Sequence, residues 1–375
     1  FIQKLEPLLI EFAGFSGRYQ WRPFESVVRP ALPEVSSKGW VRNPIDRFIT
    51  AEHQSRGLTP QTPAAPEILL RRVYLDLTGL SPSPDVIRKF IKESKTNSNA
   101  YEDVVTRLLD DPAYGERWGR HWMDVWRYSD WAGYKASLRD SQRHIWHWRD
   151  WIIESLNEDK PYDRMLVEML AADEVAPDDA DAVRATGFLA RHYFHERDQW
   201  MDNVVKHTSQ GFLGITVGCA KCHDHMYDPI SQRDYYAMRA IFERYSVRTD
   251  RVPGVLDTAK NGIPRAYDNT LAVQTWLFES GDERRPLKDE AIPAGVPASL
   301  GGSFVVEPVS LPLLAVKPER REFVKRDLIA QAENVVANAK NEVALQAADS
   351  KLATLKPLLE IEPLEDGGRK NSEEW

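Results

Sequence analysis

Residues 114–128 read Tyr-Gly-Glu-Arg-Trp-Gly-Arg-His-Trp-Met-Asp-Val-Trp-Arg-Tyr, and this stretch indicates the fold class. Its large side chains recur at the spacing of a helix. Trp118, His121, Trp122 and Val125 occupy positions i, i+3, i+4 and i+7, so they share one face. We therefore predict a helix over 114–128, and we expect this face to be buried.

Helix signals continue on both sides of this stretch. Ser83 with Pro84 at the first helical position, and Ser231 with Asp234 three residues later, are typical helix starts. Sustained alternation with a period of two is absent from residues 41–250, which are therefore predicted to form a multi-helix domain. The other predicted helices span residues 65–77, 85–93, 100–110, 144–156, 162–171, 181–192 and 197–212.

The remaining segments differ in composition. Residues 1–40 show no period, and we predict a lead-in or linker. Prolines accumulate over 251–316, which predicts an irregular segment with short strands such as Ser303–Val309. Residues 317–375 are predicted to form a long helical arm and a polar tail, and the arm (317–356) fits either a coiled coil or an ordinary surface helix. The predicted fold class is mainly α.

The composition excludes several classes of protein. Of the 375 residues, 42% are hydrophobic and 28% charged, which argues against disorder. Lys+Arg 49 against Asp+Glu 57 gives a net charge of −8, which argues against generic nucleic-acid binding. No apolar run approaches the roughly 18 residues that a membrane-spanning helix needs. The sequence opens at Phe1 rather than at a methionine, and we expect it to be part of a longer multidomain protein.

The two cysteines of the chain stand three residues apart, and a histidine follows at once, in Cys219-Ala220-Lys221-Cys222-His223. Cys-x-x-Cys-His is the attachment signature of a c-type haem. One helical turn presents both thiols to the two vinyl groups of the macrocycle, and the adjacent imidazole reaches the iron. We predict one covalently attached haem c, with Cys219 and Cys222 as anchors and His223 as the proximal ligand.

Other interpretations of the two cysteines remain open. A zinc site would use both of them together with two of His223, His225 and His207. A thioredoxin-type redox pair would follow a β-strand, which this region does not predict. Two inert buried cysteines are a third alternative. Beside the motif, His225 or Asp224 is expected to hydrogen bond the proximal imidazole or a haem propionate, unless the segment is a solvated turn at Asp228.

The aromatic face of the 114–128 helix supplies candidates for the second side of the haem. His121 is the predicted sixth ligand of the iron. Trp118 and Trp122 would pack on the macrocycle, and Arg117 would pair with a propionate, because a guanidinium matches the geometry of a carboxylate.

The sixth ligand has rivals, and the choice decides the chemistry. His207, a methionine such as Met201 or Met238, and an open position are the alternatives. A strong sixth ligand favours electron transfer, whereas an open iron favours chemistry of the peroxidase or oxidase type.

Several further motifs occur in a fixed order along the chain. They are Asn43–Phe48, Leu70–Leu80, Tyr114–Trp118 with His121-Trp122, Lys160–Asp163, Ala185–Phe188 and Gly218–Ile230. With them the chain resembles the planctomycete cytochrome-associated domain of unknown function, over residues 39–250. The resemblance implies that His121, His223, His225 and Asp228 sit at motif positions. The stretch 190–196 departs from the family pattern by two extra histidines, His192 and His195, which could approach the haem.

The resemblance also implies an exported protein of planctomycetes or related bacteria, in the periplasm or at the cell surface. With the motif, it predicts a mono-haem c-type cytochrome that exchanges electrons with a redox partner protein or a neighbouring haem domain of the parent chain. The alternatives are a haem enzyme with an open distal site, and a scaffold with a structural haem that oligomerises through the 317–356 arm. No phosphate-binding loop, nucleophile elbow or His-Glu-x-x-His motif points to another activity.

Overall fold

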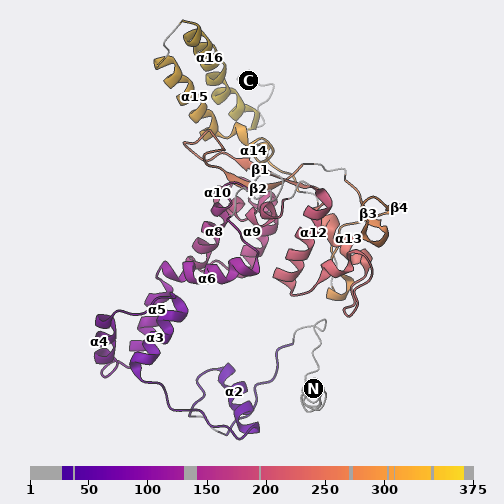
Figure 1. Ribbon diagram of the computed structural model, residues 1–375. Coiled ribbons are helices and arrows are strands. Elements are labelled where there is room, and N and C mark those ends of the chain that lie inside the picture. Colours follow the sequence, from indigo (N-terminus) through magenta and orange to yellow (C-terminus); the bar gives the residue numbers. More distant parts are fainter. Residues whose placement is uncertain are drawn as a thin grey trace, which may run out of the picture. The chain divides into compact units, whose positions relative to one another are not determined.

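The computed structural model describes residues 28–36, 39–130, 142–193, 196–269, 273–301, 304–307, 309–338 and 342–366 (Figure 1). The chain divides into two compact units, residues 1–65 and 66–375. Much of the predicted lead-in, including residues 1–27, lies outside the described part of the chain. In the first unit, α2 (Pro44–Ser55) begins with a capping box, because Asn43 and Asp46 each accept a hydrogen bond from the other's backbone N–H.

The second unit begins with three helices, α3 (Pro66–Leu77), α4 (Pro84–Glu93) and α5 (Ala100–Leu109), close to the predicted spans. The Ser83 hydroxyl accepts a hydrogen bond from the Val86 N–H and so caps α4, as predicted. The three helices enclose a small core of their own, made of Leu70, Val73, Phe90, Ala100, Val104 and Leu108.

Helix α6 (Ala113–Val125) packs against α8 (Trp146–Asn157) through its glycines. A Cβ at Gly115 would lie 2.5 Å from the carbonyl oxygen of Ile153, so the two helices approach this closely only because the residue is glycine. A Cβ at Gly119 would lie 3.2 Å from the Ile153 side chain. The face of α6 that meets the core is thus the one with the smallest side chains.

The prediction that the aromatic face of α6 is buried was therefore wrong. Trp118 is 37% exposed and Val125 is 46% exposed, while Trp122 is half-buried and His121 is exposed. The helical period was predicted correctly, but it does not say which face packs inward when glycines recur every four residues on another face.

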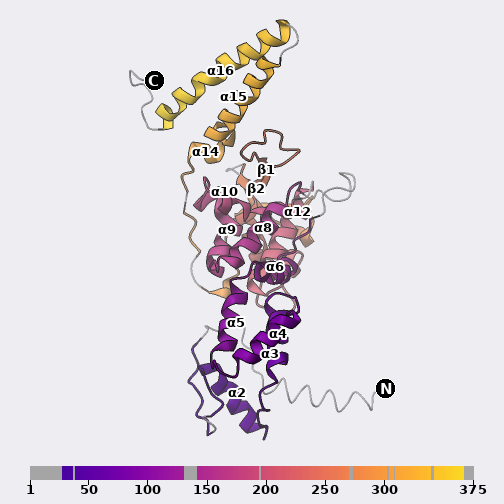
Figure 2. The same ribbon diagram turned by 90° about the vertical axis from the view of Figure 1, so that its left-hand side faces the viewer.

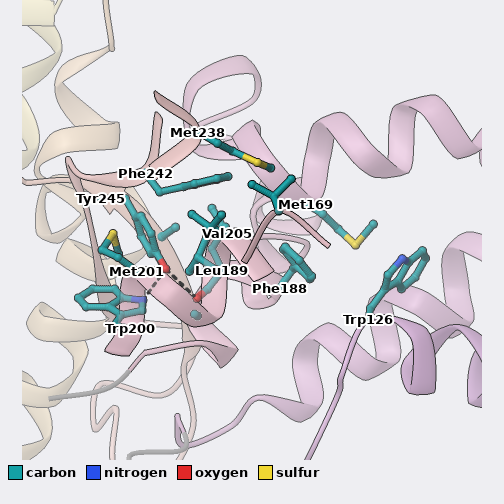
Figure 3. Close-up of a cluster of buried hydrophobic side chains, with 14 of the residues drawn as sticks. Trp126, Met169, Phe188, Leu189, Trp200, Met201, Val205, Met238, Phe242 and Tyr245 are labelled. Atoms are coloured by element: carbon teal, nitrogen blue, oxygen red, sulfur yellow. Dashed lines mark hydrogen bonds between the residues drawn. The ribbon is translucent and has the colours of Figure 1, made fainter. Parts of the chain in front are cut away.

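A larger core, whose members lie between Trp126 and Ile292, holds the central helices together (Figure 3). Its side chains come from α8, from α11 (Gly187–Arg191) and from the helices that precede and follow α11. Trp200 donates its indole N–H to the Tyr245 hydroxyl, which donates in turn to the Leu189 carbonyl oxygen at 3.3 Å (Figure 3). The remaining helices of this region are α9 (Tyr162–Val175), α10 (Ala180–Arg184), α12 (Arg197–Thr208) and α13 (Gln232–Phe242).

The helix predicted over 181–192 is interrupted, and a tertiary contact explains the break. Its two parts, α10 and α11, are separated by Ala185-Thr186. The Thr186 hydroxyl donates to the Val183 carbonyl at 2.8 Å and accepts from the Ala266 N–H at 3.1 Å. Because Ala266 lies in a distant strand, this interruption is not visible in the local helical pattern.

Two antiparallel hairpins follow the helices. Strand β1 (Tyr245–Asp250) pairs with β2 (Ile263–Asp268), and β3 (Thr275–Phe278) pairs with β4 (Pro286–Ile292). The strand predicted over Ser303–Val309 was wrong for its described residues, 304–307 and 309, which are irregular. Phe304, Val305 and Val306 are exposed, and Pro308 in that stretch has no backbone N–H to donate to a neighbouring strand.

The chain ends in a helical hairpin, in agreement with the predicted arm (Figures 1 and 2). After α14 (Leu313–Val316), helix α15 (Glu322–Ala337) packs along α16 (Glu342–Asp366). Ala332 and Ala348 are buried, and Lys356 forms an ion pair with Glu333 at 3.2 Å. Within the described residues, no helix combines the length and the apolar character needed to cross a membrane.

Candidate functional site

The Cys-x-x-Cys-His motif begins in a 3-10 helix, Val217–Lys221, with Cys222 as its C-cap. The Cys219 N–H donates to the Thr216 carbonyl at 3.0 Å, as expected for this tight turn. Cys219 lies within this helix and Cys222 directly follows it, so the two cysteines are about one turn apart. Both are free thiols and both are exposed.

Lys221, between the two cysteines, fixes the turn to the helices beneath it. Its carbonyl oxygen accepts hydrogen bonds from Gln232 Nε2 at 2.9 Å and from the Tyr236 hydroxyl at 3.2 Å. Its Nζ forms an ion pair with Asp198 Oδ2 at 2.8 Å. The same carboxylate accepts a hydrogen bond from Arg239 at 2.6 Å.

The Asp198 carboxylate is the charged centre of this support. Burial raises the pKa of Asp198, but the hydrogen bonds from Lys221 and Arg239 outweigh it and hold the pKa below its usual value. The carboxylate therefore stays ionised at neutral pH. It connects α12, α13 and the turn that carries the motif.

His223 is exposed, and its hydrogen bond sets the tautomer of its ring. Nδ1 lies 2.7 Å from the backbone carbonyl oxygen of Asp224. A carbonyl only accepts, so Nδ1 carries the proton and the lone pair is on Nε2. Metal-bound histidines commonly use this arrangement, with one ring nitrogen on a carbonyl and the other on the metal.

His225 has a different role, because its ring is fully engaged in the loop. Nδ1 accepts from the backbone N–H groups of Tyr227 at 3.2 Å and Asp228 at 2.8 Å. Nε2 therefore carries the proton, lies 2.9 Å from the Thr216 hydroxyl and faces the Asp228 carboxylate at 3.5 Å. The predicted bond to the His223 ring is not among its hydrogen bonds within the described chain. The Asp224 carboxylate accepts from the Gln232 N–H at 2.8 Å and so caps α13.

The residues predicted for the second side of a haem lie on α6. The His121 ring meets Trp118 edge-on, with ring centroids 5.5 Å apart, and Trp122 stacks on Trp126 at 4.9 Å. The Arg117 side chain packs over Gly79, where a Cβ would lie 3.0 Å from its Cδ. Within the described residues, no hydrogen bond or ring contact joins these α6 side chains to the motif, so the structure leaves them as a separate group.

The other candidate ligands occupy varied positions. His207 Nδ1 lies 3.3 Å from Nδ1 of the buried His192, and burial lowers the pKa of His207 to about 4. Met201 and Met238 are buried in the larger core (Figure 3). His195 lies outside the described residues. Within the described residues, the motif included, no group of three or more His, Cys, Asp or Glu side chains is arranged to hold a metal ion.

Sequence reasoning missed the residues that hold the motif in place. Gln232, Tyr236 and Asp198 come from α12 and α13, and their contacts with Lys221 depend on how those helices pack. The capping box at Ser231 and Asp234, which was predicted and is present, marks the start of α13 one residue before Gln232. That cap was the one feature of the local sequence that pointed to the region of these supporting residues.

Comparisons with known proteins place the chain in a family. No curated protein and no solved structure matches it. The family model described as PSCyt2, protein of unknown function (DUF1549), matches residues 44–247, more than half of the chain. The match contains α6 and the whole Cys-x-x-Cys-His turn with its loop. The chain therefore belongs to the PSCyt2 family.

Proposed function

We propose that this protein carries one covalently attached haem c and transfers electrons. Cys219 and Cys222 would hold the macrocycle, and His223 would bind the iron through Nε2. The observation that carries the proposal is the His223–Asp224 hydrogen bond, which leaves the lone pair of an exposed imidazole on Nε2, next in sequence to two free, exposed thiols of a tight turn.

The donor set fits this group and fits zinc less well. Two thioethers and one neutral imidazole are what a c-type haem requires of the chain. A zinc site would need two histidines, but His225 is bonded through both ring nitrogens and His207 is bonded to His192 through Nδ1. The described residues also contain no group of three or more His, Cys, Asp or Glu side chains arranged to hold a metal ion. His223 is thus the one histidine beside the thiols whose Nε2 makes no hydrogen bond within the described residues.

The chain's own residues would attach and orient the group. Each thiol would add across a vinyl group, so that a sulfur–carbon bond would form and the thiol proton would go to the neighbouring vinyl carbon, without net oxidation. The Asp224 carbonyl keeps the His223 ring in one tautomer and orientation. Bound haem supplies a one-electron couple at its iron.

The cellular setting is part of the same proposal. We propose an exported protein of planctomycetes or related bacteria, in the periplasm or at the cell surface, where it exchanges electrons with a partner protein or a haem domain of its parent chain. This setting is what the resemblance of the sequence motifs implies, and the exposed thiols of the motif support access by a partner.

The test is the visible spectrum of protein produced in a host that matures c-type haem. We expect haem that stays on the polypeptide after denaturation and extraction in acidic acetone, and sharp α and β bands on reduction. Replacing both Cys219 and Cys222 with alanine is expected to abolish the covalent haem. His223→Asn is expected to keep the covalent haem and change its spectrum, whereas His225→Asn is the matched control beside it.

Other outcomes would change the conclusion. A broad high-spin spectrum of the reduced protein would replace electron transfer with a haem enzyme that has an open site. Folded protein without haem, from cells that load another c-type cytochrome, would overturn the proposal and leave Cys219 and Cys222 as a redox or metal-binding pair.

A further inference from the structure

The β3–β4 hairpin touches the motif at Cys222. Gly281, at the tip of the hairpin, has a φ of +76°, and a Cβ built on it would lie 2.6 Å from Cys222 Sγ. The next nearest atoms, at 3.3 and 3.4 Å, are the Lys221 carbonyl oxygen and the Cys222 Cα. The glycine backbone therefore packs on this thiol, although Cys222 as a residue is exposed. None of these nearest atoms belongs to Cys219.

One side chain ties the hairpin to the motif. The Gln232 Nε2 group donates to the Lys221 carbonyl at 2.9 Å and to the Phe278 carbonyl, at the end of β3, at 3.1 Å. An amide nitrogen has two N–H donors, and here one is directed to the motif and the other to the hairpin. Gln232 thus sets the distance between Cys222 and the hairpin tip.

Further contacts hold the hairpin against α13. The Arg239 guanidinium lies 4.9 Å from the centroid of the Phe278 ring. The Tyr236 ring meets the same Phe278 ring edge-on, with the ring centroids 5.2 Å apart. Arg233 forms an ion pair with Glu290 of β4 at 2.8 Å. Tyr236 and Arg239 are buried, and Ile292 at the end of β4 belongs to the larger core, so the strands of the hairpin are anchored in that core. The tip of the hairpin, between the two strands, is half-buried or exposed.

We propose that the β3–β4 hairpin covers the Cys222 thiol and makes the two thiols of the motif unequal. Cys219 reacts first with a bulky group, and Cys222 reacts only when the tip of the hairpin, around Gly281, moves away. Gln232 and Gly281 are positioning residues for this cover. The identity of the bulky group as haem rests on the proposed function, but the inequality of the thiols does not.

The hairpin lies beyond the residues that match the family model, which end at 247. The part of the chain that defines the family therefore contains the motif, and the segment after it supplies the cover. Because small molecules reach an exposed cysteine whereas a large planar group needs space around the sulfur, the cover acts on bulky reactants.

The first measurement compares the two thiols in the haem-free folded protein. Cys222→Ser leaves Cys219 alone, and Cys219→Ser leaves Cys222 alone. Labelling rates are measured with iodoacetamide as a small reagent and with a fluorophore-bearing maleimide as a bulky one. With the bulky reagent we expect Cys219 to react at least about tenfold faster, and we expect the difference to disappear in urea. A similar ratio for both reagents, or equal rates in the folded protein, would overturn the proposal.

The second measurement releases the cover. In the Cys219→Ser background, Gln232→Glu removes both amide donors without a change in size, so two carbonyl oxygens would face a carboxylate. Gly281→Ala adds a methyl group where Cys222 Sγ leaves no room. Each is expected to accelerate bulky labelling of Cys222, and neither should change the rate of Cys219 in the Cys222→Ser background. Unchanged Cys222 rates in both variants would refute the role of the hairpin.

Matched controls separate this effect from charge and strain. Gln199→Glu introduces the same charge at an exposed position of α12. Gly254→Ala places alanine at a φ of +79° with no neighbour within 4 Å. Both controls should leave the labelling rates unchanged. Failure of the thiol experiment with covalent haem still attached would refute only the cover, whereas unequal thiols without haem attachment would refute only the proposed function.

Discussion

The side-chain oxygen of Asn157 accepts a hydrogen bond from the backbone N–H of Gly115 at 2.8 Å, and its amide nitrogen donates to the Pro112 carbonyl at 3.2 Å. One residue at the end of α8 thus supplies a hydrogen-bond acceptor to the first turn of α6, where backbone N–H groups have no partner within the helix. The same amide would lie 2.6 Å from a Cβ at Gly115. This contact and the nearby Ile153 carbonyl make Gly115 sensitive to any added atom.

Gly115→Ala is expected to destabilise the protein by about 1–3 kcal/mol, because overpacking costs that much at a rigid contact. At an exposed helical site the same change would stabilise by up to about 1 kcal/mol. Gly119→Ala is the graded comparison, since its nearest atom is a side-chain carbon at 3.2 Å and not a backbone oxygen at 2.5 Å, and its cost should be smaller. The free energies of unfolding of both variants are measured in urea. Equal losses of stability in the two variants would contradict the packing described for α6.

His225→Ala is expected to lower the free energy of unfolding by about 1–3 kcal/mol, because it leaves the Tyr227 and Asp228 N–H groups without their acceptor. His225→Asn retains an oxygen near the position of Nδ1 and should recover part of the loss. The measurement is thermal unfolding of the haem-free protein. If asparagine proved as harmful as alanine, the ring would have a role other than accepting these two hydrogen bonds.

Asp173 is expected to make the protein less stable as pH rises from about 4 to about 7. Burial, with smaller effects of Glu174 and Asp268, raises the pKa of Asp173 to about 7, while Arg265 lowers it. The folded state holds this proton over a range in which the unfolded state has released it, so stability falls with pH by at most about 4 kcal/mol. Asp173→Asn should remove this slope.

The corresponding experiment is urea unfolding of wild type and Asp173→Asn between pH 4 and pH 8. Asp181→Asn, at a side chain that is 83% exposed, is the control and should keep the wild-type slope. An unchanged slope in Asp173→Asn would show that the carboxyl group is already ionised in the folded protein at pH 4.

His207 is expected to change stability with pH in the opposite direction to Asp173. Because burial, followed by the charges of Arg127, Lys206 and Arg191, lowers its pKa to about 4, the unfolded state binds the proton more readily below about pH 6.5. Stability should therefore fall as pH drops from 6.5 to 4. Replacing His207 with asparagine should flatten this part of the curve, and His121→Asn, at an exposed position, should not. A wild-type slope in the His207 variant would contradict the buried pairing with His192.

The sequence determined some features through local chemistry alone. The caps at Ser83 and Ser231 were predicted because an N-cap needs only neighbouring residues. The orientation of α6 was predicted incorrectly, since Gly115 and Gly119 acquire their meaning only when α8 lies against them. The break at Thr186 depends on Ala266, eighty residues later in the chain.

The candidate site also combines features that the local sequence predicts with features that depend on tertiary packing. The types and spacing of Cys219, Cys222 and His223 are evident in the sequence, because the proposed covalent attachment needs only neighbouring residues. The tautomer of His223 follows from a backbone carbonyl, and the contact of Cys222 with Gly281 follows from the docking of a hairpin. Neither can be read from spacing, because both depend on tertiary geometry.

The tryptophans of the larger core give the protein a built-in optical signal. Trp126, Trp148 and Trp151 are at most 1% exposed, whereas Trp118 at the surface of α6 is 37% exposed. The buried indoles should emit at short wavelength and resist quenching by iodide, whereas iodide should reach exposed indoles such as Trp118 and Trp40. A covalently attached haem would accept excitation energy from all of them, so the loss of fluorescence during maturation would report loading without any added label.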